Sequence, residues 1–198
     1  MTFLRIFFIL FCMSTLQSCV TAAVSAVATT GVLLAQERSV GTAVDDTGIW
    51  ASVKEKYLRQ NAQDLLAGVN VEVVEARVLL TGVVDTSETR IDAVRLAWQV
   101  EGVKEVINEI KIEPRSQKKL KHIAKDNWIA TQLKTKMLFA RNIRTLNYSI
   151  DVIRNTVYLM GIARDQQELD ELTHMASTIK GVDKVVSHVR LKDNPERG

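Results

Sequence analysis

Val78-Leu79-Leu80-Thr81-Gly82-Val83-Val84 is followed 79 positions later by Val157-Tyr158-Leu159-Met160-Gly161-Ile162-Ala163, the same apolar pattern around one glycine. The match extends without a gap from residues 71–112 to residues 150–191. Two copies are too few for a solenoid, which needs three or more units to cover its faces. A period of this length instead indicates two small tandem domains, each with a modest core of its own.

Each copy predicts the order strand, strand, helix, strand. The predicted strands are residues 69–74, 77–83 and 103–112 in the first copy and 149–153, 156–162 and 182–191 in the second. A helix precedes each copy: Asp45-Asp46 resembles a helix start, and Asp126 is predicted to cap the second such helix. The expected fold class is therefore α+β, with two helices packed on a three-stranded sheet in each domain (αββαβ).

These elements divide the chain into six segments. Pro114 marks the break between the domains, because helices and central strands both exclude proline. The predicted segments are a leader at 1–18, a lipidated tether at 19–44, a first domain at 45–113, a linker at 114–125, a second domain at 126–192 and a tail at 193–198.

The N-terminus has the shape of a secretory leader, with Arg5 before an apolar run. The leader closes on Leu16-Gln17-Ser18-Cys19, which resembles a bacterial lipobox. That resemblance implies cleavage before Cys19, diacylglycerol on its thiol and an acyl group on its amine, and Val20 after it implies passage to the outer membrane. An uncleaved membrane helix is the less favoured alternative, because polar residues interrupt the apolar run before about 20 residues are reached. Cys12 would leave with the leader, so no mature disulfide is expected.

The two copies also resemble a known family. The strand 78–84 and the turn Val100-Glu101-Gly102-Val103, with their counterparts 157–162 and 179–186, are similar to BON domains. With the lipobox and the helix opened by Asn127-Trp128, the layout resembles the dual-BON-domain outer-membrane lipoproteins. The resemblance implies a mixed sheet in each domain and a periplasm-facing lipoprotein. It also implies support of envelope integrity and binding of anionic phospholipid through the second domain.

The residues themselves favour a phospholipid site on the helix that starts the second domain. Residues 114–150 contain nine Lys or Arg and one acid, Asp126. Helical spacing places Ile129, Leu133 and Met137 on one core stripe. The opposite face and its flanks carry the predicted phospholipid-binding residues, which are Trp128, Thr131, Gln132, Lys134, Thr135, Lys136, Leu138 and Phe139. Apolar side chains outside the core stripe, bordered by lysines, are typical of interfacial membrane binding.

The corresponding helix of the first domain lacks this character. Gly48 replaces Trp128, Glu55 replaces Thr135 and Arg59 replaces Phe139, so the first domain is not expected to bind lipid. The alternative for Trp128, Leu138 and Phe139 is packing against the other domain. A protein-interaction adaptor for outer-membrane assembly or cell-wall remodelling, without direct lipid binding, is the alternative function.

No enzyme is expected. His122, His174 and His188 are scattered, recur in no catalytic arrangement and are predicted to lie on the solvated surface. No metal-ligand spacing or phosphate loop is present, so no metal and no cofactor beyond the lipid on Cys19 is expected. Nucleic acid is an unfavoured partner for an exported, acylated chain, although a basic helix with Trp could stack bases.

Overall fold

The computed structural model describes residues 40–60, 63–113 and 119–195, which belong to one compact unit. The leader, Cys19, Pro114 and residues 196–198 lie outside the described residues, as do most of the predicted tether and part of the predicted linker. The two repeats are called domain 1 and domain 2 below, and residues that match in the repeat are called counterparts. Counterparts lie 79 positions apart, except in the helix that opens each domain, where Asp46 aligns with Asp126 and the buried Ile49 with Ile129, 80 positions apart.

Domain 1 contains the predicted elements and one short helix, at Gln63–Gly68, that was not predicted. Its elements are α3 (Val40–Arg59), α4 (Gln63–Gly68), β1 (Val69–Val74), β2 (Arg77–Val84), α5 (Ser87–Trp98), β3 (Glu105–Asn108) and β4 (Lys111–Ile112). Strand β1 pairs antiparallel with β2, which pairs in parallel with β3 and β4. The last two are halves of the predicted strand 103–112. They are separated where Ile110 is buried and its N–H donates to Asn108 Oδ1.

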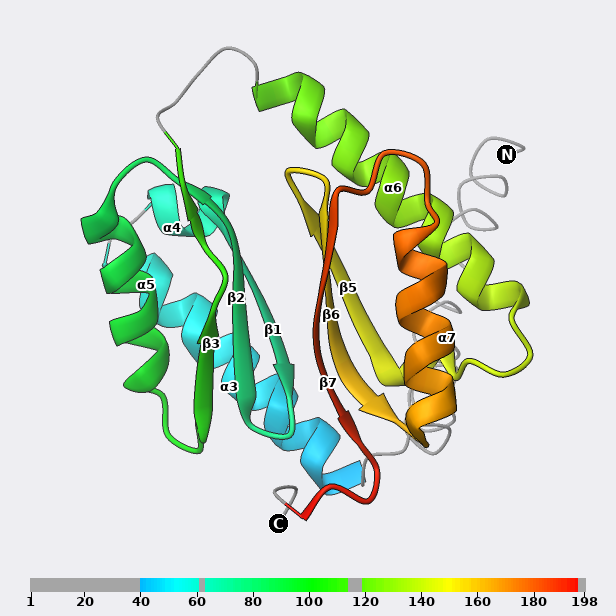
Figure 1. The fold of residues 1–198 in the computed structure, drawn as a ribbon. Coiled ribbons are helices and arrows are strands. Elements are labelled where there is room, and N and C mark those ends of the chain that lie inside the picture. Colours follow the sequence, from blue (N-terminus) through cyan, green and yellow to red (C-terminus); the bar gives the residue numbers. More distant parts are fainter. Residues whose placement is uncertain (1–39, 61–62, 114–118, 196–198) are drawn as a thin grey trace, which may run out of the picture. The chain divides into compact units, whose positions relative to one another are not determined.

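Domain 2 repeats this topology. Its elements are α6 (Lys119–Phe139), the short 3-10 helix η1 (Thr145–Asn147), β5 (Tyr148–Ile153), β6 (Thr156–Ala163), α7 (Gln166–Ser177) and β7 (Lys184–Leu191). Strand β6 lies between an antiparallel β5 and a parallel β7. The predicted α+β fold, with helices packed on a three-stranded mixed sheet in each domain, is confirmed (Figure 1).

The long helices start earlier than predicted. Helix α3 begins at Val40 and α6 at Lys119, so Asp46 and Asp126 lie inside the helices and do not cap them. Each of these buried carboxylates accepts two backbone N–H bonds from the hairpin turn of its own domain. Asp46 accepts from Glu75 and Ala76, and Asp126 accepts from Arg154 and Asn155, all at 2.8–2.9 Å. All four turn residues have positive φ, the conformation of a tight two-residue hairpin. The aspartates therefore fasten each helix to its sheet.

Gly82 and Gly161 lie within β2 and β6, not at turns or strand ends. A Cβ on Gly82 would stand 2.0 Å from Gly68 O, and one on Gly161 would stand 2.1 Å from Asn147 O. The repeated glycine therefore lets the chain entering the first strand cross closely against the central strand.

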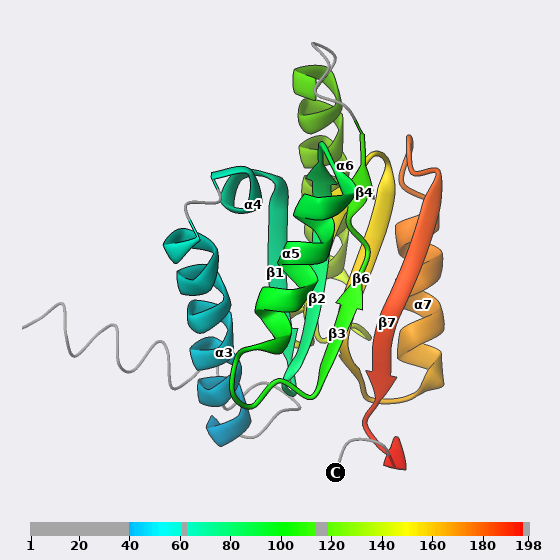
Figure 2. The ribbon, with the colours of Figure 1, turned by 90° about the vertical axis from the view of Figure 1, so that its left-hand side faces the viewer.

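Each domain has its own core between sheet and helices, and a third apolar cluster lies between the domains. The third cluster is formed by Val74, Leu79, Tyr158, Met160 and Ile162, with Ile107, Ile153 and Val186 packed against it. It contains three counterpart pairs: Val74 with Ile153, Leu79 with Tyr158, and Ile107 with Val186. Its members therefore meet around an approximate two-fold axis. The sheets face each other, and α3 with α5 and α6 with α7 cover the outer faces (Figures 1 and 2).

Candidate phospholipid-binding surface

Helix α6 is oriented by its core stripe. Ile129, Leu133 and Met137 have no exposed surface, because they pack beneath α7 and the sheet of domain 2. The opposite side therefore faces outward. Trp128 is 47% exposed, Leu138 71% and Phe139 83%, and none of the three belongs to the cluster between the domains. Their packing against the other domain, the alternative drawn from the sequence, is not what the structure shows.

The polar residues predicted for this surface are also exposed. Thr131, Gln132, Lys134, Thr135 and Lys136 have exposed side chains. The Thr131 hydroxyl donates to Asn127 O at 2.8 Å, so its hydrogen is already used within the helix. The structure thus brings all eight predicted residues onto one exposed helix surface. We call these eight residues the α6 face.

Lys134 lies at the domain 1 side of the α6 face. Burial raises the pKa of Glu72 in β1 above its ordinary 4.5, and Asp151 raises it further, whereas a hydrogen bond from Ser149 and the nearby Lys134 and Lys54 oppose that rise. Lys134 therefore lies near an acid of domain 1. Lys136 is the better placed of the two predicted lysines for an outside anion.

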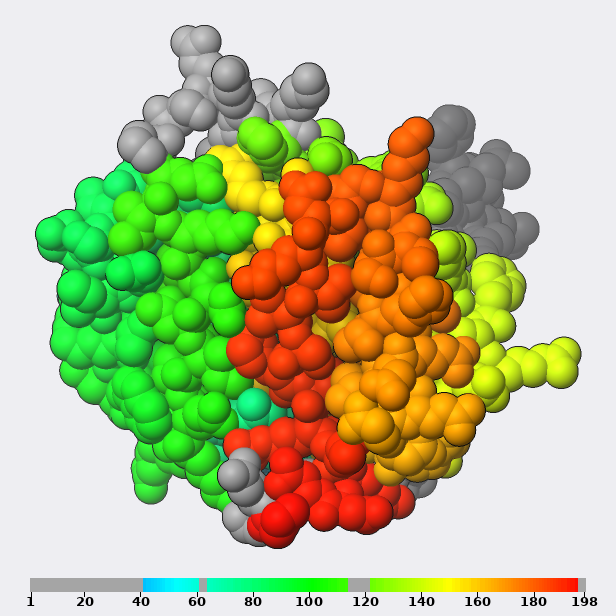
Figure 3. Space-filling view, viewed as in Figure 1, coloured from blue at the N-terminus to red at the C-terminus, as the bar shows by residue number. Residues whose placement is uncertain are grey.

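The chain beyond α6 extends the surface in a way that sequence periodicity does not reveal. Arg141 and Arg144 are exposed, and Leu146 in η1 is 47% exposed. Leu146 was missed because it lies outside the helix, where the 3.6-residue spacing gives no information. Figure 3 shows the end of α6 and the turn after it projecting from the molecular surface.

The turn after α6 is held by a buried carboxylate. Glu168 is 1% exposed, and its two oxygens accept from Arg144 N–H at 2.7 Å and Arg164 N–H at 2.9 Å. Its own N–H donates to the side chain of Asp165 at 2.9 Å, so Asp165 caps the start of α7. The counterpart in domain 1 is Thr89, so this clamp is confined to domain 2. It fixes Arg144 relative to the end of α6.

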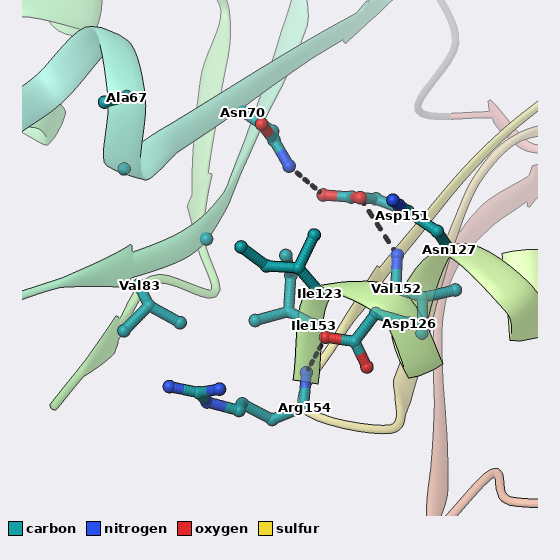
Figure 4. Close-up of a pocket in the computed structure, with 12 residues that line it drawn as sticks. Ala67, Asn70, Val83, Ile123, Asp126, Asn127, Asp151, Val152, Ile153 and Arg154 are labelled. Atoms are coloured by element: carbon teal, nitrogen blue, oxygen red, sulfur yellow. Dashed lines mark hydrogen bonds between the residues drawn. The ribbon is translucent and has the colours of Figure 1, made fainter. Parts of the chain in front are cut away.

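A cavity of about 210 Å³ lies beside the first half of α6, between that helix and domain 1. Figure 4 shows Asn70 pointing to Asp151 and the Arg154 backbone to Asp126. The charged groups on its wall are already paired: Asp126 with the hairpin turn, Asp151 with Asn70 and Thr81, and Arg154 with Glu113. These charged groups are therefore not available to bind a ligand in the cavity.

The histidines do not assemble into a site, but one of them was placed wrongly. His174 is exposed as predicted, whereas the His188 side chain is only 19% exposed and lies 3.0 Å from Glu109 between the domains. Glu109 is the counterpart of His188 in domain 1, and nothing in the linear sequence indicates that these two residues meet. Within the described residues no group of three His, Cys, Asp or Glu side chains is arranged to hold a metal ion.

Comparison with known proteins decides the family. The BON domain model matches residues 45–114 and again residues 125–193. The chain belongs to the BON-domain family. Both matches coincide with the two structural domains, so the α6 face lies on the first helix of the second BON domain.

Several relatives match most of the chain. A protein from the gshII 5′ region of Anaplasma centrale is 39% identical over 78% of this chain and 99% of its own length. The outer membrane lipoprotein DolP of Haemophilus influenzae is 32% identical over 90% of this chain and 91% of its own. A 21 kDa hemolysin of Actinobacillus pleuropneumoniae is 31% identical over 75% of each chain. The likeness to DolP suggests a location in the cell envelope.

Among solved structures, CdsD of the Chlamydia trachomatis type III secretion system matches 71% of this chain and 90% of its own, with 11% identity and a TM-score of 0.30. A score at that level supports no statement about function. Among the described helices, none is long and apolar enough to cross a membrane.

Proposed function

We propose that this protein is a lipid-anchored protein of the outer membrane, facing the periplasm, that binds anionic phospholipid through its second BON domain and supports envelope integrity. The observation that carries the proposal is the α6 face, where Trp128, Leu138 and Phe139 are exposed beside Lys136. An indole suits the headgroup level of a bilayer, because its ring is apolar while its N–H stays hydrated.

The surrounding charge favours an anionic bilayer. Arg141 and Arg144 follow the helix, and both are exposed next to the apolar end at Leu138 and Phe139. Each Lys or Arg near an anionic leaflet contributes on the order of 1 kcal/mol, and salt screens that contribution. The likeness to DolP supports the outer membrane as the location.

The anchor belongs to the proposal as well. Acylation of Cys19 rests on the resemblance of residues 16–19 to a lipobox, and those residues lie outside the described structure. A covalent lipid and a weak headgroup site act as two signals, and together they hold a protein more firmly than either alone. The α6 face then selects the lipid composition beneath an already tethered domain.

The decisive experiment is cosedimentation of residues 20–198 with vesicles of phosphatidylglycerol and, separately, of phosphatidylcholine. Trp128→Glu is expected to abolish binding to the anionic vesicles. Trp98→Glu is a matched control, because Trp98 is 51% exposed but lies on α5 of the first domain. Binding by Trp128→Glu that equals the wild type would refute the lipid site.

A protein-interaction adaptor remains the second candidate, and α5 favours it. Ile91 is 61% exposed and Trp98 51%, seven residues apart and therefore on one side of the helix. Their counterparts in α7 are Asp170 and Ser177, so domain 2 has no such surface. If Trp98→Glu, and not Trp128→Glu, disturbs the envelope in cells, an outer-membrane or cell-wall protein is the partner to seek.

A further inference from the structure

A groove opens at one end of domain 1, where the start of α3 passes the turn between α5 and β3. Its volume is about 760 Å³, and its lining includes Val44, Asp45, Gly48, Glu101, Gly102 and Lys104. It is open because Gly48 has no side chain there: a Cβ on Gly48 would meet no atom within 4 Å. We call this the acidic groove, since Asp45 and Glu101 are exposed at its rim.

The corresponding place in domain 2 is filled from its own chain. Trp128 is the counterpart of Gly48, and Lys125 is the counterpart of Asp45. The Lys125 stem covers Gly181, with Cε 3.0 Å from where a Cβ on that glycine would stand. The matching Gly102 is met only by Ile49. Domain 2 therefore presents a ridge where domain 1 presents a groove. We define the basic ridge as Lys125, Trp128, Lys180 and Asp183.

The exposed charges of groove and ridge are inverted position by position. Asp45 corresponds to Lys125, and Glu101 corresponds to Lys180. The single base of the groove, Lys104, corresponds to Asp183. All six side chains are exposed. If each position met its counterpart on another molecule, all three contacts would therefore be between opposite charges.

We propose that a second copy of this chain docks its basic ridge into the acidic groove. Trp128 of one copy occupies the space above Gly48 of the other, and the three charge pairs surround it. Meetings between counterparts already occur within the chain, where Glu109 lies against His188 and Leu79 packs near Tyr158.

The placement of the two surfaces determines how such an assembly grows. Figure 1 shows the α5–β3 turn at the lower edge of the molecule and the α7–β7 turn at the upper edge. Each copy therefore offers one groove and one ridge at different ends. A heterologous contact of this kind extends beyond two copies, into a ring where the rotation between copies closes and into an open filament where it does not. Trp128 cannot occupy a groove and a bilayer together, so docking and lipid binding are alternative uses of one side chain.

The test measures self-association of the full-length protein in a non-ionic detergent by sedimentation velocity, without anionic lipid. The wild type is expected to gain mass with concentration. Glu101→Lys and Lys180→Glu are each expected to weaken association by about fivefold, as an opposite-charge contact becomes a repulsive one. The double variant Glu101→Lys with Lys180→Glu is expected to recover, since its charges are again opposite.

Asp193→Lys serves as the control, because Asp193 is exposed and belongs to neither surface. A wild type that stays monomeric at every concentration overturns the proposal. Single reversals that match Asp193→Lys overturn it too, and so does a double variant that fails to recover. Neither Glu101 nor Lys180 lies on the α6 face, so these results stand apart from the vesicle experiment.

Discussion

Glu109 and His188 hold the same position in the two repeats, and His188 Nε2 lies 3.0 Å from Glu109 Oε1. Counterparts can meet in this way only near an axis that exchanges the two domains. A second set of contacts has the same symmetry. The Asn70 amide donates to Asp151 Oδ2, and their counterparts, Ser149 and Glu72, are also hydrogen-bonded. Polar pairs therefore surround the apolar cluster between the sheets.

The shared cluster is expected to make the two domains unfold together. Leu79 is 1% exposed and faces domain 2, so Leu79→Ala should cost about 2–5 kcal/mol of unfolding free energy. Hydrogen exchange should report lower protection in both domains to a similar extent. Full protection of β6 and α7 in this variant would show that domain 2 is stable without its neighbour.

Core and surface of α6 are expected to respond differently to substitution. Leu133 has no exposed surface, and Leu133→Ala should lower the unfolding free energy by about 2–5 kcal/mol. Trp128→Glu should change it by less than about 1 kcal/mol, because the ring lies off the core stripe. Urea titration measures both values. A large loss for Trp128→Glu would mean that the indole supports the fold.

Removing the Asp126 carboxylate is expected to loosen the hairpin of domain 2. Asp126→Ala leaves the N–H groups of Arg154 and Asn155 without their acceptor, at a cost of about 1–3 kcal/mol. Asp45→Ala is the control, since Asp45 is an exposed acid on the matching helix. Equal stabilities of the two variants in thermal melts would contradict the role given to Asp126.

Two glycines are expected to respond in opposite directions to alanine. Gly161→Ala would force a Cβ to within 2.1 Å of Asn147 O at a φ of +151°, so it should cost more than about 4 kcal/mol or prevent folding. Gly48→Ala meets no atom and lies inside α3, so it should stabilise by about 0.5–1 kcal/mol. Circular dichroism melts distinguish them. A tolerated Gly161→Ala would rule out the close crossing beside β6.

Glu72 is expected to make stability depend on pH. Burial raises its pKa above 4.5 in the folded protein, so the folded state holds this proton to higher pH than the unfolded state. Its contribution to stability therefore falls as pH rises from about 4.5 through the raised pKa. Glu72→Gln should flatten that decline. Unfolding free energies at several pH values provide the comparison, and parallel curves for the two proteins would exclude Glu72 as the cause.

The sequence predicted what lies within one repeat better than what lies between repeats. The strands followed from short apolar runs bounded by turns, and Ile129, Leu133 and Met137 followed from helical spacing. The run 78–84, which is apolar apart from Thr81 and Gly82, also indicated that β2 is buried on both faces. The run does not indicate that the second face of β2 is covered by the sheet of domain 2, because a buried Leu79 is equally compatible with a helix or a sheet packed on it.

Asp126 and His188 were predicted wrongly for a similar reason. Asp126 precedes an apolar helical stripe, which is also where a capping residue would stand, yet its partners lie 28 and 29 positions further along. The partner of His188 is 79 positions earlier. Residues that act through a distant contact carry no local pattern. At the candidate site, helical periodicity predicted the eight residues on α6, whereas it could not predict Leu146.

The carboxylate of Asp126 links α6 to more than its own sheet. It holds the turn at Arg154, and the Arg154 guanidinium is ion-paired to Glu113 of domain 1 at 2.6 Å. A tilt of α6 would therefore move domain 1 as well. A bilayer that fixes the angle of α6 would in this way also fix the orientation of α5. The lipid bound by domain 2 would then determine the direction in which Ile91 and Trp98 of domain 1 face the surrounding space.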